Sequence, residues 1–151
     1  SISAAGLRPD GAEHLEVVEH RHGTGWVVDW LAERVKRWPV VAVALDPKGP
    51  AGSLVDDLMA RLPDDMLIQA TAGDQCQAAA ALLDAIEAGT VRHLGQHELD
   101  AAAEAARKRP IGDAWAWTRS GTTVPISPLV STTLARWALR RPRKTKPVFA
   151  Y

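Results

Sequence analysis

Asp46 is the residue whose position best suits chemistry. It follows an apolar run over residues 40–45 (VVAVAL) and opens a loop rich in proline and glycine. An unbroken apolar run is typical of a strand buried on both faces, and ligands of open α/β sheets bind beyond the carboxyl ends of the strands. A carboxylate there can face a cation or a phosphate. Position alone leaves a second interpretation open, in which Asp46 only fixes the loop or caps the next helix.

Other candidate motifs indicate no active site. Residues 46–53 contain glycines but lack the Gly-Lys-Ser/Thr ending of a phosphate-binding loop. His93 and His97 are four residues apart, but a glycine lies between them and the glutamate of a zinc-protease helix is missing. Ser127 lacks the glycines of a nucleophile elbow. Cys76 is the only cysteine, which excludes an internal disulfide and a thiolate metal cage and indicates a reducing cytosol.

The elements that must position these residues alternate between strands and helices. The chain opens with a predicted β-hairpin over residues 1–20, whose turn is the Pro-Asp-Gly segment at 9–11. Hydrophobic periodicity and capping signals predict the rest. We expect helices over about 27–38, 52–61, 75–87, 96–107 and 127–140, and strands over 40–45, 66–70 and 114–118. This order predicts an α/β fold with one mixed sheet flanked by helices.

Size and composition are those of one globular domain. The chain has 151 residues, of which 46% are hydrophobic and 24% charged, which excludes a disordered chain, a coiled coil and a collagen-like fibre. No apolar run approaches the ~20 residues of a membrane-spanning helix, and the N-terminus carries no export signal. We predict one domain over residues 1–141, a basic tail over 142–151, and no contact with membranes.

Charge is balanced overall but unevenly distributed. The chain has 18 basic and 18 acidic residues, yet no acid follows residue 131. An uncompensated basic segment favours a polyanionic partner, and a solubilising tail is the alternative. The basic residues of this segment are Arg136, Arg140, Arg141, Arg143, Lys144 and Lys146.

Three stretches of the second half resemble a known family. They are residues 91–100 (VRHLGQHELD), 106–117 (ARKRPIGDAWAW) and 126–135, which begins ISPLV. In this order and spacing they are similar to the C-terminal nuclease domain of the large terminase subunit of tailed bacteriophages and prophages. The first half is similar more loosely, through the hairpin, residues 25–29 and the strand that ends at Asp46.

The resemblance implies an RNase H-like fold that cuts double-stranded DNA during packaging. In that family a carboxylate cluster holds two Mg²⁺ or Mn²⁺ ions, which activate water and stabilise the leaving oxygen. It also implies the bacterial host cytoplasm and, as partners, the terminase ATPase domain, the small terminase subunit and the portal. No Walker-type motif occurs in this sequence, so the motor would lie outside this chain.

Carried over residue by residue, the resemblance supplies few metal ligands. Asp46 matches the acid at the end of the central strand. The family's first acid lies on a strand before the hairpin, so that first strand is expected to be missing here. Pro125 stands where the last acid is usual, and Asp113 is the nearest carboxylate that could substitute. Asp46 and Asp113 are therefore the candidate catalytic residues and metal ligands.

The expected activity is weak or absent cleavage. Two cations about 4 Å apart need several carboxylates, and one clearly retained aspartate leaves most of the coordination to water. Two alternatives remain open: a non-catalytic DNA-binding or assembly module, and a decayed prophage remnant. The candidate DNA contacts are Lys108, Arg109, Arg140, Arg141, Arg143 and Lys144.

Overall fold

The computed structural model describes residues 1–118 and 120–141 and contains five α-helices and three small sheets within those ranges. The predicted basic tail, including Arg143 and Lys144, lies outside them. The elements in chain order are β1 (Ile2–Leu7), β2 (Glu13–Glu19), α1 (Val27–Val35), β3 (Val43–Leu45), the 3₁₀ helix η1 (Pro50–Leu54), α2 (Val55–Arg61), β4 (Leu67–Gln69), α3 (Ala72–Glu87), β5 (Val91–Arg92), α4 (His97–Ala105), β6 (Arg107–Ile111), β7 (Ala114–Thr118) and α5 (Ser127–Arg140).

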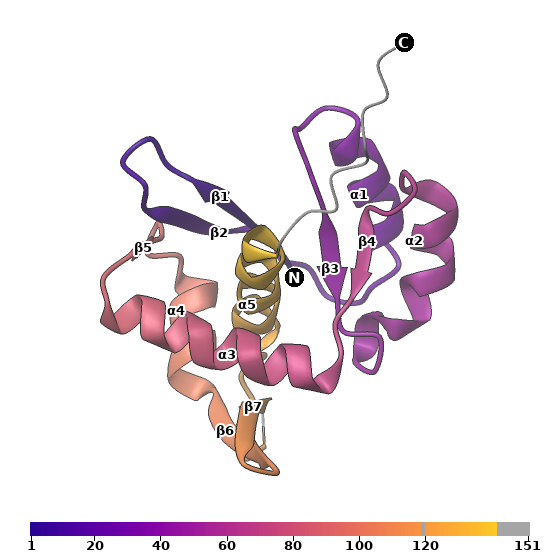
Figure 1. Cartoon of the computed structure of the whole chain (residues 1–151). Coiled ribbons are helices and arrows are strands. Elements are labelled where there is room, and N and C mark those ends of the chain that lie inside the picture. The colour runs from indigo at the N-terminus through magenta and orange to yellow at the C-terminus, as the bar shows by residue number, and fades with distance from the viewer. Residues whose placement is uncertain (119, 142–151) are drawn as a thin grey trace.

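The prediction of an α/β fold is confirmed, but the strands do not form one mixed sheet. They pair in the orders β1-β2-β5, β3-β4 and β6-β7. β3 and β4 have three residues each and β5 has two, so these strands offer few ladder positions. The sheets are linked through helices, above all through α5, which lies between the β1–β2 hairpin and the β3–β4 pair (Figure 1).

The first sheet is the predicted hairpin extended by one short strand. β1 and β2 are antiparallel, and Gly11 adopts a φ of +83° in the turn between them, a conformation that suits glycine. β5 pairs with the start of β2 in parallel. Beyond β5, the side-chain amide of Gln96 both accepts from Val17 N and donates to Val17 O at 2.8 Å. This pair of bonds extends the ladder along β2.

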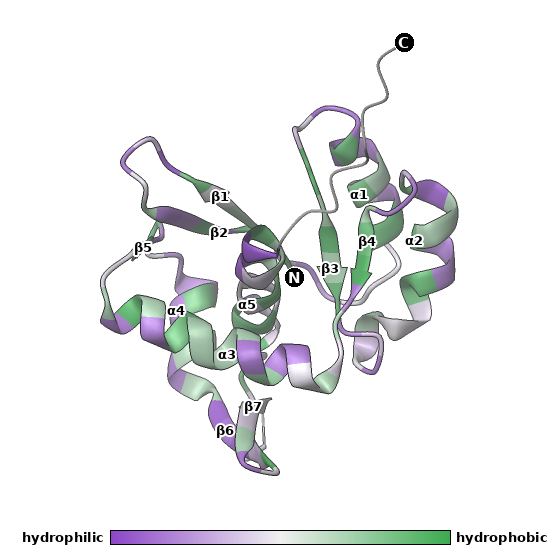
Figure 2. Cartoon of the chain, in the orientation of Figure 1, coloured by the Kyte–Doolittle hydropathy of each residue, from purple (hydrophilic) through white to green (hydrophobic). Residues whose placement is uncertain are grey.

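The second sheet is covered on both faces, as the apolar run predicts. Val43, Leu45 and Leu67 pack with residues of α1 and α2. Ala44 and Ile68 lie on the opposite face and pack against α5 and α3. Figure 2 shows β3 and most of β4 in green, the colour of hydrophobic residues. Helices on both faces explain why β3 has no alternation of polar and apolar residues.

The third sheet is a hairpin of which only β7 is predicted. β6 has the sequence RKRPI and pairs with β7 in register from Arg107–Thr118 to Ile111–Ala114. A segment with a proline and three basic residues is not expected to form a strand, but proline is tolerated in an edge strand, which pairs on one side. Ala116 of β7 is buried, and β7 packs against α3. No helix of the described residues is long and apolar enough to cross a membrane.

Candidate functional site

Asp46 lies directly after β3 and is half-buried. Its Oδ1 accepts a hydrogen bond from Lys48 N at 2.9 Å, and its main-chain oxygen accepts from Gly49 N at 3.2 Å. A Cβ added at Gly49 would stand only 2.9 Å from Asp46 Oδ2, so the carboxylate lies close over the loop. This is the loop-fixing role left open by the sequence, and it uses one of the two carboxylate oxygens.

A second carboxylate, that of Asp74, lies at the same edge of the sheet. Because β3 and β4 are parallel, their carboxyl ends meet there, and Ala70 N donates to Leu45 O at 2.9 Å. Thr71 follows and caps α3: Thr71 Oγ1 accepts from Asp74 N at 3.1 Å, and Thr71 N donates to Asp74 Oδ2 at 2.8 Å. Asp74 is not among the candidate residues named from the sequence, although the pattern Thr-x-x-Asp before a helix is similar to a capping-box signal.

Hydrogen bonds and a nearby cation keep Asp74 ionised. The hydroxyl and main-chain N–H of Thr71, and more weakly the charge of Arg141, hold the pKa of Asp74 below its usual range. The guanidinium of Arg141 stands 4.6 Å from the ring centroid of Trp137, which packs in one cluster with Ala70, after β4, and Ala78 of α3. Its charge is partly offset by this carboxylate.

Asp113 is not brought to this edge. It is the exposed second residue of the two-residue turn between β6 and β7, in which Gly112 has a φ of +60°. Figure 1 shows that the tip of this hairpin points away from β3 and β4. Among the described residues no three or more histidine, cysteine, aspartate or glutamate side chains are grouped so that they could hold a metal ion. The residues present therefore do not fit a two-metal centre.

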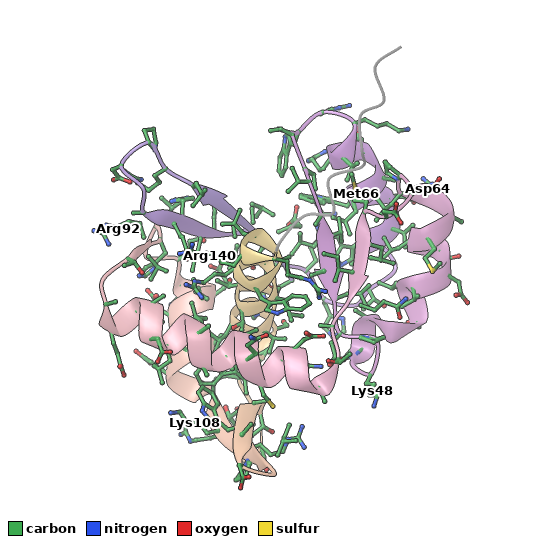
Figure 3. The ribbon with its side chains drawn as sticks, viewed as in Figure 1. Lys48, Asp64, Met66, Arg92, Lys108 and Arg140 are labelled. Carbon is green, nitrogen blue, oxygen red and sulfur yellow. The ribbon has the colours of Figure 1, made fainter. Side chains whose placement is uncertain are left out.

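The cations of β6 are exposed and differ in what they contact. Arg107 Nη1 donates to the main-chain oxygens of Glu104, Ala105 and Ala106, each at 3.0 Å, so it caps the end of α4. Lys108 and Arg109 point to opposite sides of the strand. The Nζ of Lys108 lies 4.3 Å from the ring centroid of Trp115. Figure 3 shows Lys108 at the lower end of the molecule, where the hairpin projects.

Arg140 has an internal partner. Its Nε forms an ion pair with Oε1 of Glu13, a side chain that is 1% exposed, although the Arg140 side chain itself is 61% exposed. Figure 3 shows Arg140 beside the β1–β2 hairpin and Lys108 at the lower end of the molecule. The candidate DNA contacts thus belong to two separate surfaces, and Arg140 takes part in holding the fold.

Comparison of the chain with models of protein families, with curated proteins and with solved structures finds no match.

Proposed function

We propose that the chain is the nuclease-type domain of a phage DNA-packaging terminase, that it binds duplex DNA through the phosphate backbone, and that it cuts DNA weakly or not at all. The observation that carries this proposal is the hairpin of β6 and β7. It is formed by one of the stretches that resemble the terminase family, residues 106–117, and it presents a cationic strand to solvent. Backbone contacts by lysine and arginine supply most of the affinity for DNA without reading its sequence.

The arrangement of α5 supports an RNase H-like fold from which one strand is missing. Among the described residues β1 pairs only with β2 and β3 only with β4, and α5 packs against both β1 and β3. Because Val43 and Leu45 face β4, the N–H and C=O groups of Ala44 point to the other side of β3. We propose that the family's first strand inserts between β1 and β3 and joins the two sheets.

Such a strand also bears on catalysis. If this added strand runs parallel to β3, its carboxyl end lies beside Asp46. In the family that the chain resembles, the first acid lies on this strand. In the described residues Asp46 has no group of further ligands, so this chain alone is expected to bind Mg²⁺ or Mn²⁺ weakly. The ATPase domain, the small terminase subunit and the portal are the partners we propose from the resemblance, in the cytoplasm of a bacterial host.

DNA binding is tested with a fluorescent duplex and the variants of β6. The double variant Lys108→Ala/Arg109→Ala is expected to bind less tightly at every sequence, with a salt slope smaller by about 0.9 per lost phosphate contact. Lys36→Ala, an exposed lysine at the end of α1, is the matched control and leaves both quantities unchanged. Anisotropy titrations between about 50 and 200 mM salt measure the slope. The proposal is contradicted if the wild type does not bind the duplex at the lowest salt concentration, or if the double variant binds it with the same affinity as the wild type.

Cleavage is tested separately with plasmid DNA and Mn²⁺. Slow nicking or none is expected, and any nicking disappears in Asp46→Asn. Asp113→Asn is the comparison, because this residue lies at the tip of the hairpin and away from β3. Nicking that survives in Asp46→Asn removes Asp46 from the proposal, and rapid cleavage by the wild type contradicts the weak activity.

A further inference from the structure

The outer edge of β4 has no strand beside it among residues 1–118 and 120–141. β4 is joined to β3 by bonds that include Val43 N to Met66 O and Ala70 N to Leu45 O, both at 2.9 Å. In a parallel pair every second residue of a strand bonds to the same neighbour. The residues at even positions, 66, 68 and 70, therefore face β3.

The intervening residues face outward. Leu67 and Gln69 direct their N–H and C=O groups away from β3, toward a side where no strand of the described chain pairs with them. A row of such groups is a template for pairing with another extended chain. Edge strands of this kind bind peptides by strand addition, in which main-chain bonds supply affinity and side-chain pockets supply specificity.

A hollow of about 210 Å³ lies beside β4, and the residues that line it include Leu67 and Gln69. The end of α2 and the following turn close the other side, through residues that include Met59, Asp64 and Asp65. Met59 is 61% exposed, so its apolar side chain is accessible to a partner at this hollow. The hollow therefore combines an apolar contact with carboxylates at its rim.

The charge at this rim is acidic. Asp64 is exposed (Figure 3 labels it next to Met66, at the start of β4). The nearest arginine along the chain, Arg61, has its guanidinium 2.9 Å from Asp29 Oδ1 of α1, so its charge is already engaged. Carboxylates at this position repel phosphates and attract lysine or arginine. The surface is thus opposite in charge to β6 and suits a protein partner rather than DNA.

We propose that the outer edge of β4 binds an extended, basic segment of a partner protein. The segment adds as a strand beside Leu67 and Gln69, places a lysine or arginine at Asp64, and packs an apolar side chain on Met59. An amphipathic helix does not suit the site, because a helix satisfies its own backbone groups and would leave those of the β4 edge without partners. This proposal is independent of the DNA-binding role of the β6–β7 hairpin.

The test uses NMR with the ¹⁵N-labelled chain and a blocked hexapeptide of alternating lysine and valine. Binding is expected to shift the amide resonances of Leu67 and Gln69 and to slow their hydrogen exchange. Asp64→Asn is expected to weaken binding about two- to fivefold, as for a rim charge pair. Asp57→Asn, an exposed aspartate of α2 that does not line the hollow, is the matched control and leaves the affinity unchanged.

A backbone variant tests the strand addition itself. Gln69→Pro removes one outward N–H at a position where an edge strand tolerates proline, and it is expected to weaken peptide binding about tenfold. If that variant does not fold, the charge tests still decide. Three results overturn the proposal: no amide shifts at Leu67 and Gln69, equal binding of a hexapeptide with glutamate in place of lysine, or shifts centred on β1 or β3.

Discussion

Glu13 connects the first sheet to α5, and its replacement is expected to destabilise the fold severely. The residue lies on β2, its main-chain N–H donates to Thr90 O, and its side chain is 1% exposed. Arg136 Nε donates to Glu13 Oε2 at 2.5 Å, and Arg136 Nη1 donates to Ala81 O at 2.9 Å. One buried ion pair thus ties β2, α5 and α3 together, with Arg140 as a second partner at the surface.

The magnitude follows from what remains after Glu13→Gln. The Arg136 side chain is 9% exposed, so its positive charge stays buried with neutral acceptors alone, the carbonyl of Ala81 and the amide oxygen of the new side chain. Removing one partner of a buried ion pair costs about 3–5 kcal/mol, a large part of the ~5–15 kcal/mol by which a domain is stable. With a urea dependence of about 2 kcal/mol per M, the midpoint of unfolding should fall by about 2 M.

Equilibrium unfolding in urea, followed by tryptophan fluorescence, measures this shift. Glu16→Gln is the matched control: it is the same substitution on the same strand, at a carboxylate 37% exposed whose partner is His14. It should lower the free energy of unfolding by less than about 1 kcal/mol. A similar midpoint for the two variants would refute the reasoning, because burial of the Glu13–Arg136 pair would then have no energetic consequence.

Two further predictions concern the loop of Asp46 and the start of α3. In Gly52→Ala the new Cβ would lie 2.1 Å from Pro47 O, and because this neighbour is main chain, we expect a loss of about 1–3 kcal/mol in thermal unfolding; an unchanged melting temperature would contradict the packing of this loop. Asp74→Asn removes the carboxylate that accepts from Thr71 N at the start of α3, and it should lower the free energy of unfolding by about 1 kcal/mol at neutral pH. Because the folded pKa of Asp74 is lowered, its stabilisation is present above the unfolded pKa of about 3.9 and is lost as pH falls through the folded value. The wild type and Asp74→Asn should therefore converge in stability in acid; a constant difference down to about pH 2 would contradict this.

Local patterns predicted the helices better than the sheets. The last helix was expected over 127–140 and is found at Ser127–Arg140, because an amphipathic pattern and an early proline are both local signals. The strand expected over residues 40–45 is shorter in the structure and covers only Val43–Leu45. Strand pairing depends on partners far along the chain, and no local signal indicates that, among the described residues, β3 pairs only with β4. β6 is a strand because β7 pairs with it, although its own composition does not favour one.

The same limit applies to the candidate site. The position of Asp46 at the end of a buried strand could be predicted, because it depends on neighbouring residues. The ion pair of Arg140 with Glu13 could not, since the two residues are 127 positions apart. Asp113 is the carboxylate nearest to Pro125 in the sequence, but it follows Gly112 in a tight turn and lies at the tip of the hairpin. Nearness to Pro125 along the chain therefore does not place Asp113 beside Asp46.

Some basic side chains are paired with carboxylates of the same chain, and this pairing determines which of them can bind a partner. Among the described candidates, Arg140 is paired with Glu13, and Arg141 lies near the Asp74 carboxylate and over Trp137. These charges are partly offset, so their attraction for phosphates is reduced. Lys108 and Arg109 stand on a projecting hairpin, and Lys108 contacts an aromatic ring that leaves its charge intact. A formal net charge of zero is thus compatible with DNA binding, because the hairpin keeps its positive charge while the acids gather elsewhere, including the rim beside β4.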